Sequence, residues 1–188
     1  FELKKAEPEI VVKENPVAAI DIEGFGKMEF ELFANDAPQS VYNFIELANS
    51  KFYDGLTMHR LVKDFVIQGG DPKGNGSGGP GYSIEGEFIN NGILNENKHE
   101  IGTLAFARSQ DKNSAGSQFY IVTGEKGTGD RMSNDYAAFG KITKGKEVLE
   151  KLNEQETGNN DVPNKKIKIK SIKVDTKNIV YPKAKKIH

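Results

Sequence analysis

The apolar segments of this chain are short, and glycine-rich turns separate them. Residues 27–33 (KMEFELF) alternate apolar with charged side chains, which is the period-two pattern of a strand with one face in water. Residues 17–23 (VAAIDIE) precede this strand across a turn that contains glycine, so the pair predicts a β-hairpin. Further short strands are predicted at residues 65–67, 103–107, 118–123, 137–142 and 166–174.

The last predicted strand changes phase along its length. Ile167 and Ile169 fall on one face, whereas Ile172 and Val174 follow in the opposite phase. One extra residue near Ser171 would bring both pairs to the same side of a sheet. A β-bulge or kink is therefore predicted there.

Two segments have helical periodicity. The first begins at Asp36 and Pro38 and ends near Ser50, and its inward stripe includes Phe44, which is predicted to lie in the core. The second is short and carries Val148, Leu149 and Leu152. Many short strands with only two helices predict a mainly β fold, a closed or nearly closed antiparallel barrel, because closure removes exposed strand edges.

The composition is that of one nearly neutral domain. The chain has 188 residues, enough for a sizeable core. Charged residues make up 28% of it, yet the formal net charge is -1, so nucleic acid is not an expected partner. Cysteine is absent, which excludes disulfides, thiolate catalysis and cysteine-bound metal. No apolar run approaches the length needed to span a bilayer.

The sequence divides into three parts. We expect a charged N-terminal tether at residues 1–16, one folded domain at residues 17–175 and a basic C-terminal tail at residues 176–188. The charged opening and the lack of cysteine favour an extracytoplasmic, surface-anchored bacterial lipoprotein whose lipidated start has been removed. A cytoplasmic protein is the alternative.

The segment 72–86 contains a formal dinucleotide-binding pattern. Gly74, Gly76 and Gly79 satisfy GxGxxG, but Pro80 and Gly81 follow where a helix should begin to bind a pyrophosphate. We therefore predict a loop on the rim of a site, and keep nucleotide binding through Gly74 to Gly79 as the less favoured alternative.

No metal, cofactor or nucleophile is predicted. The histidines lack the spacing of HExxH, and no GxSxG elbow is present. Asp111 and Asn113 resemble the start of a calcium loop, but Val122 stands at its twelfth position, where a glutamate is needed. His59 could act as a general base beside Arg60, although a hydrogen-bonded structural histidine is the preferred interpretation.

Residues 58–71 (MHRLVKDFVIQGGD) set an arginine beside a short apolar strand, with Arg60 in the strand or turn just upstream. The string HRxxxxFxxQGGD in this segment resembles a signature of the cyclophilin family of peptidyl-prolyl cis-trans isomerases; its residues here are His59, Arg60, Phe65, Gln68, Gly69, Gly70 and Asp71. Residues 114–123 (SAGSQFYIVT) resemble the second signature of that family, and the order and distance of the two also fit. The resemblance runs from about residue 17 to residue 174.

The resemblance implies an eight-stranded antiparallel barrel, closed, with a helix capping each end and an active groove on its outside. The implied activity is rotation about Xaa-Pro peptide bonds, which assists protein folding and needs no cofactor. The implied partners of the monomer are proline-containing peptides and unfolded or folding proteins. The alternative is a proline-peptide binding module or chaperone with little needed turnover.

The resemblance implies that Arg60 is the catalytic residue, which donates a hydrogen bond to the proline nitrogen of the twisted amide. The resemblance implies that the other matching positions contact the substrate. Phe65, Val66 and Tyr120, with Met132, would line an apolar pocket for the proline ring, and Gln68 and Gln118 would orient the substrate carbonyl and help to position Arg60. The backbone of Ala107 and Arg108 would hold the peptide on one side, and Tyr136 is the remaining substrate-binding position.

Several of these positions depart from the usual residues of the family. Tyr120 and Tyr136 replace a phenylalanine and a histidine, Val66 replaces a methionine, and Arg108 replaces an asparagine. The chain has no tryptophan, although many members have one in the region that is residues 127–134 here. That tryptophan hydrogen-bonds the cyclic inhibitor cyclosporin, so we expect cyclosporin binding to be weakened.

Overall fold

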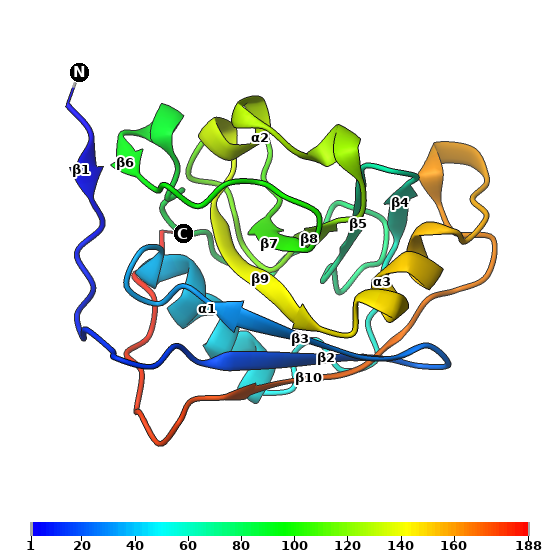
Figure 1. Ribbon diagram of the computed structural model, residues 1–188, viewed down its shortest axis with the longest axis horizontal. Helices are drawn as coiled ribbons and strands as arrows, with labels where there is room; N and C mark the ends of the chain where they lie inside the picture. Colours follow the sequence, from blue (N-terminus) through cyan, green and yellow to red (C-terminus); the bar gives the residue numbers. More distant parts are fainter. Residues whose placement is uncertain (1, 188) are drawn as a thin grey trace.

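The computed structural model describes residues 2–187, so that Phe1 and His188 lie outside the described residues. Its main sheet has eight antiparallel strands in the order β10-β2-β3-β9-β7-β8-β5-β4 (Figure 1). The bounds in chain order are β2 Val17–Ile22, β3 Gly26–Leu32, β4 Arg60–Val62, β5 Val66–Gly69, β7 Thr103–Phe106, β8 Phe119–Val122, β9 Ala138–Lys144 and β10 Ile169–Asp175. The predicted hairpin is the pair β2 and β3.

The two edges of this sheet approach each other without forming a ladder. The chain just before β4 is joined to the chain around the start of β10 by backbone bonds from Gly55 N–H and Met58 N–H to the carbonyls of Ile169 and Ile167, both 2.8 Å long. The prediction of eight antiparallel strands is confirmed. Full closure was overstated, because β4 and β10 do not pair and the sheet curls into a half-barrel.

The bulge predicted in the last strand is confirmed. Ile169 pairs with Ile22, but Ser171 pairs with Asp21, so Lys170 is the extra residue. Because of this insertion Ile169 and Ile172 both point into the core, where each is at most 1% exposed.

Both predicted helices are present, as α1 Pro38–Asn49 and α3 Lys146–Asn153. A third helix, α2 Asp130–Asp135, was not predicted, because its six residues carry no apolar repeat. The remaining elements are short: β1 Lys4–Lys5, which pairs in parallel with β6 Ile93–Leu94, and the 3₁₀ turns η1 Ile89–Asn91, η2 Glu125–Gly127 and η3 Asn159–Asp161.

The core lies between α1 and the inward face of the sheet. Phe44 of α1 is fully buried, as predicted, and its ring centroid lies 5.2 Å from that of Phe139 and 5.7 Å from that of Phe119. Phe106 stacks on Phe139 at 4.5 Å. Aromatic rings from three strands thus fix the position of the helix.

A buried glutamate takes the place of a side-chain cap at the start of α1. Ala37 has no side chain that could bond the first turn. Glu87, which is 1% exposed, instead accepts hydrogen bonds from Gln39 N–H (3.1 Å), Ser40 N–H (2.7 Å) and the Ser40 hydroxyl (2.7 Å). The carboxylate therefore fastens α1 to a segment more than forty residues away in the chain.

Both terminal segments lie along the same side of the domain (Figure 1). Val12 is buried and exchanges two hydrogen bonds with the Asn35 side chain, at 2.9 and 2.8 Å. Near the other end, Ala184 is buried and Lys185 N–H donates to the Gln39 amide oxygen at 2.7 Å. The domain limits drawn from the sequence remain a prediction, and the described parts of both flanking segments are bound to the domain surface.

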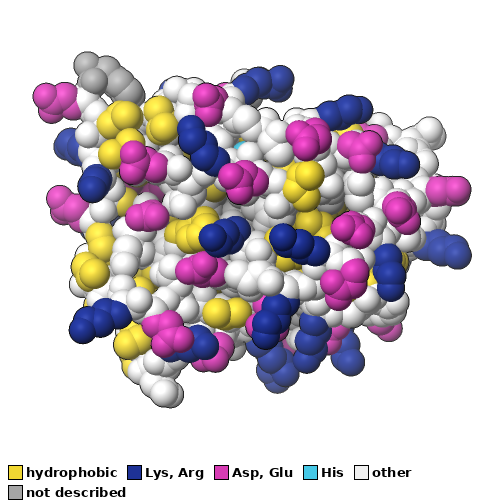
Figure 2. All heavy atoms as spheres, viewed as in Figure 1, with side chains coloured by type: hydrophobic (Ala, Val, Ile, Leu, Met, Phe, Trp, Pro, Cys, Tyr) yellow, Lys and Arg dark blue, Asp and Glu magenta, His cyan; other side chains and the backbone are white. Residues whose placement is uncertain are grey.

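Acidic and basic side chains are interspersed over most of the face drawn in Figure 2, in keeping with the small net charge. Within residues 2–187, no helix combines the length and the apolar character that a membrane crossing requires.

We predict that Glu87 makes the stability of the fold depend on pH. Burial raises the pKa of Glu87 from 4.5 to about 7, against the opposing effect of its hydrogen bonds. The folded state binds the carboxyl proton of Glu87 more tightly than the unfolded state does. The stabilisation of the fold by this proton is therefore complete below pH 4.5 and is lost as pH rises towards 7. The difference in unfolding free energy between the native protein and Glu87→Gln should fall by roughly 2–3 kcal/mol over that range in urea titrations. A constant difference from pH 5 to pH 8 would contradict this.

Candidate functional site

A row of outward-facing side chains crosses four strands of the sheet. In the strand register Arg60 of β4 lies opposite Gln68 of β5, which lies opposite Tyr120 of β8, which lies opposite Ala105 of β7. Directly opposite residues point to the same face, and their chain neighbours point to the other. The inward row is Leu61, Ile67, Ile121 and Leu104, all at most 1% exposed. The row that contains Arg60 is therefore on the outside of the half-barrel.

Beside Arg60, an apolar cluster separate from the core covers the outside of the sheet. We call it the outer cluster, and it consists of Val66, Ala105, Tyr120, Val122 and Met132, with Phe65, Ala107 and Tyr136 packed partly buried against it. Met132 comes from α2, and Tyr136 follows directly after that helix. The Tyr136 ring meets the Tyr120 ring edge-on, with centroids 5.8 Å apart.

Arg60 is half-buried, and its guanidinium forms no hydrogen bond or ion pair with any of residues 2–187. A guanidinium next to apolar side chains normally finds an acceptor within the protein. Here all its N–H groups remain available to a ligand that reaches the outer cluster.

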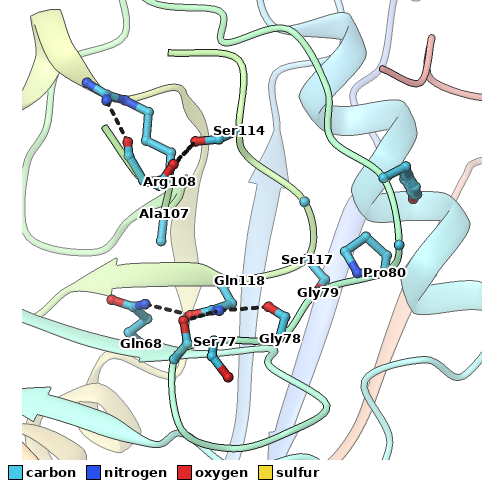
Figure 3. A pocket seen from close by; sticks show the side chains of 15 residues that line it. Gln68, Ser77, Gly78, Gly79, Pro80, Ala107, Arg108, Ser114, Ser117 and Gln118 are labelled. Carbon is cyan, nitrogen blue, oxygen red and sulfur yellow. Dashed lines mark hydrogen bonds between the residues drawn. The ribbon is translucent and has the colours of Figure 1, made fainter. Parts of the chain in front are cut away.

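The two predicted glutamines are bonded to each other and to the glycine-rich loop. Gln68 Nε2 donates to Gln118 Oε1 at 2.9 Å, and Gln118 Nε2 donates to the carbonyls of Gly76 and Gly78 at 3.0 and 2.9 Å (Figure 3). The Gln118 amide is therefore engaged in holding the loop. Gln68 points from the strand row towards a cavity that the glycine-rich loop borders.

The loop 72–86 forms one wall of this cavity, which has a volume of about 300 Å³ and is bounded on the other side by Ala107, Arg108 and Ser109. Asp71, which is 1% exposed, organises the loop by accepting the N–H groups of Lys73, Asn75 and Gly76. Burial alone would raise the pKa of Asp71, but these backbone bonds outweigh it and hold the pKa below its ordinary value. No helix follows Gly79, as the interpretation as a loop requires.

The double glycine before Asp71 is required by close packing. A Cβ on Gly69 would lie 2.5 Å from the Met58 sulfur, and one on Gly70 would lie 2.5 Å from the Ser117 carbonyl oxygen. Gly70 also has φ near +90°, which side-chain-bearing residues rarely adopt. The chain can therefore turn tightly from β5 into the loop.

Arg108 uses its side chain to clamp the end of α2. Its Nε and one terminal nitrogen donate to the Asp135 carbonyl at 3.0 and 2.8 Å. The guanidinium lies between two rings, 4.8 Å from the Phe88 centroid and 4.9 Å from the Tyr136 centroid. The sequence suggested only a backbone role for Arg108.

His59 does not fit either of its two predicted roles well. The ring is 8% exposed, and its Nδ1 has no hydrogen-bond partner within residues 2–187. Burial lowers the pKa of His59, which makes it a weaker base. Within the same residues, no group of three or more His, Asp or Glu side chains could hold a metal ion.

The structure brings every predicted site residue to the outer face or to the adjoining cavity. It adds four that the sequence analysis missed. Ala105 and Val122 follow from strand alternation once Tyr120 is placed outside, so a pattern was available for them. Phe88 and His99 lie in irregular segments, and no periodicity points to them.

Sequence comparisons with known proteins agree with this geometry. A family model described as cyclophilin type peptidyl-prolyl cis-trans isomerase matches residues 17–174. The chain is 43% identical over 131 residues to peptidyl-prolyl cis-trans isomerase B of Bacillus subtilis, covering 70% of this chain and 86% of that protein. It is 43% identical over 145 residues to peptidyl-prolyl cis-trans isomerase cypE of Dictyostelium discoideum, covering 77% and 88%.

A solved structure is similar over most of its length. The crystal structure of a cyclophilin type peptidyl-prolyl cis-trans isomerase of Cryptosporidium parvum, in the presence of the dipeptide Ala-Pro, superposes with a TM-score of 0.76 and 32% identity. The match covers 85% of this chain and 98% of that one.

We predict that Arg108→Lys loosens α2. Lysine keeps the charge but loses the bidentate fork and the stacked plane, at a cost of about 1–2 kcal/mol to the local structure. Hydrogen exchange measured by mass spectrometry should become about tenfold faster at residues 130–136, with little change in β2 and β3. Arg131→Lys, an exposed change in the same helix, is the matched control. Equal exchange in the two variants would show that Arg108 does not hold the helix.

Proposed function

The chain belongs to the cyclophilin-type peptidyl-prolyl cis-trans isomerase family and is a rotamase of Xaa-Pro bonds, and from this premise we propose how its outer face accelerates the rotation. The proline ring of the peptide enters the outer cluster, and Arg60 stabilises the twisted amide. The observation that carries this proposal is a guanidinium with no partner within residues 2–187 at the edge of an apolar surface.

The barrier to be lowered is electronic. Rotation about the peptide bond interrupts amide resonance and costs about 20 kcal/mol, which corresponds to a rate of about 10⁻² per second. In the twisted state the proline nitrogen regains its lone pair and becomes a hydrogen-bond acceptor. A donor aimed at that nitrogen stabilises the twisted state more than the planar one, and about 7 kcal/mol of such stabilisation would accelerate rotation roughly 10⁵-fold.

Arg60 has the properties of such a donor. It stays charged at any relevant pH, and it presents its N–H groups in a fixed fork. Phe65, Val66 and Tyr120 would surround the ring, with Met132 and Tyr136 closing the side formed by α2. Water excluded by these residues would strengthen the interaction with the nitrogen. No covalent intermediate and no proton transfer enters this mechanism.

The remaining groups would hold the peptide on either side of the proline. We assign the backbone of Ala107 and Arg108 to the chain preceding the proline, and the Gln68 amide to the peptide carbonyl beside Arg60. Gln118 would act through its bonds to Gln68 and to the loop. The substrates we propose are proline-containing segments of peptides and of unfolded or folding proteins, and we propose a monomer as the active species.

A binding module or chaperone with little turnover is the second candidate function. It would use the same outer cluster. Simple docking of a proline ring needs an apolar pocket and gains nothing from a cation directed at the ring nitrogen. The position of Arg60 in the outer row therefore favours the catalytic function.

We predict that Arg60→Ala lowers the catalysed rate about 100-fold or more while the fold is retained, because a single transition-state donor contributes that much in a preorganised site. The rate is that of a short Ala-Pro peptide followed by NMR exchange. Arg60→Lys should retain part of the activity, since the charge remains and the fork is lost. Arg131→Ala, which removes an exposed arginine, is the control. Full activity in folded Arg60→Ala would refute the mechanism, and peptide binding without acceleration by the intact protein would favour the second candidate.

We also predict weak inhibition by cyclosporin. The chain has no tryptophan to hydrogen-bond the inhibitor, and Met132 of α2 lies against the outer cluster. Loss of one such bond should weaken binding about tenfold or more relative to tryptophan-containing members. Calorimetric titration tests this, and an affinity equal to theirs would be contrary to the prediction.

A further inference from the structure

A buried histidine is bonded to the tyrosine of the outer cluster. His99 Nε2 lies 2.7 Å from the Tyr120 hydroxyl oxygen, and the ring centroids are 5.9 Å apart. His99 is 1% exposed and Tyr120 is 4% exposed, so neither polar group has ready access to solvent. The other ring nitrogen of His99 has no partner within residues 2–187, and the bond to Tyr120 is the one that its side chain forms there.

The backbone of His99 is hydrogen-bonded to the start of α2. Its N–H donates to the Ser133 hydroxyl at 2.7 Å, and its carbonyl accepts the Gly129 N–H at 3.2 Å. Both partners belong to the first turn of α2 and the residue before it. The helix that carries Met132 is thus joined to His99 at its start, while Arg108 clamps its end.

We propose that His99 is a positioning residue for the substrate: it binds the Tyr120 hydroxyl at the closed end of the outer cluster, so that the proline ring meets only the apolar part of that tyrosine. This inference rests on the proposed function, because it assumes that the outer cluster receives the proline ring. It concerns a residue outside the signature segments.

The physical reason is the cost of a buried hydroxyl without a partner. A phenol that loses its hydrogen bond in a buried site costs about 1–3 kcal/mol, unless it turns towards water or another polar group. Phe65, Ala107 and Tyr136 are only partly buried, so water can reach the outer cluster from their side. A hydroxyl that recruited water there would hydrate the space meant for the ring, and the ring would have to displace that ordered water in order to bind.

The ionisation of His99 is compatible with this role. Burial lowers the pKa of the His99 ring to about 4, so the ring is neutral near neutral pH. A neutral imidazole has one donor and one acceptor nitrogen and can pair with a hydroxyl without placing a charge beneath the site.

The test is a double-mutant cycle with His99→Leu and Tyr120→Phe. The measured quantities are KM and kcat for a short Ala-Pro peptide, and the Kd of the same peptide from NMR titration. In the native background, His99→Leu should raise KM and Kd about tenfold and change kcat less than about twofold. In the Tyr120→Phe background, where no hydroxyl needs a partner, the same substitution should change Kd less than about twofold. His99→Gln, which keeps a donor and an acceptor, should recover most of the affinity.

Three outcomes would overturn the inference: an unchanged Kd in His99→Leu, a loss of the same size in both backgrounds, or no recovery in His99→Gln. The second would mean that the ring only packs against α2. If His99→Leu does not fold, recovery of folding by added Tyr120→Phe supports the inference, and continued failure contradicts it. The Kd does not depend on turnover, so an inactive native protein that still binds the peptide would contradict the proposed function and leave this comparison intact.

Discussion

The alternation of side chains along four adjacent strands is the constraint on which both the core and the site depend. Across β4, β5, β8 and β7 the inward positions supply fully buried residues such as Ile67 and Ile121. The outward positions bring Arg60 into line with Gln68 and Tyr120. A slip of one residue would exchange the two sets and bury a charge in the core, so the register that satisfies the core also places the cation outside.

The site combines one charged side chain that has no hydrogen-bond partner with several polar side chains that do have partners. The Arg60 guanidinium forms no hydrogen bond or ion pair within residues 2–187, whereas the polar groups around it are engaged: Asp71 holds the loop, Gln118 joins the loop to Gln68, and Arg108 clamps α2. Such a frame keeps the cavity and the outer cluster in shape before a peptide arrives. Less ordering is then needed on binding, which leaves more of the interaction energy for the twisted amide.

The sequence predicted what depends on local pattern. Period-two segments identified the hairpin, the phase change identified a bulge near Ser171, which the structure has at Lys170, and the stripe with Phe44 identified α1. The two signature segments led to Arg60 and the outer cluster.

What could not be predicted depends on contacts between segments far apart in the chain: Glu87 at the start of α1, Phe88 beneath Arg108, and His99 behind Tyr120. Each is a single polar or aromatic residue in an irregular segment, where no period exists to reveal its partner. Full closure of the barrel was overstated for the same reason, since edge pairing is a long-range property.

The proposed mechanism requires the peptide to bind on the outside of the half-barrel, along the row that contains Arg60. The most direct test is an NMR titration of the ¹⁵N-labelled protein with a short Ala-Pro peptide, with the perturbed amides and side chains mapped on the fold. The largest shifts are expected at Arg60, Gln68 and Tyr120 and in α2, with small shifts in the terminal segments. Perturbations centred instead on the cavity lined by Thr57, His59 and Pro163, or on the terminal segments, would contradict it.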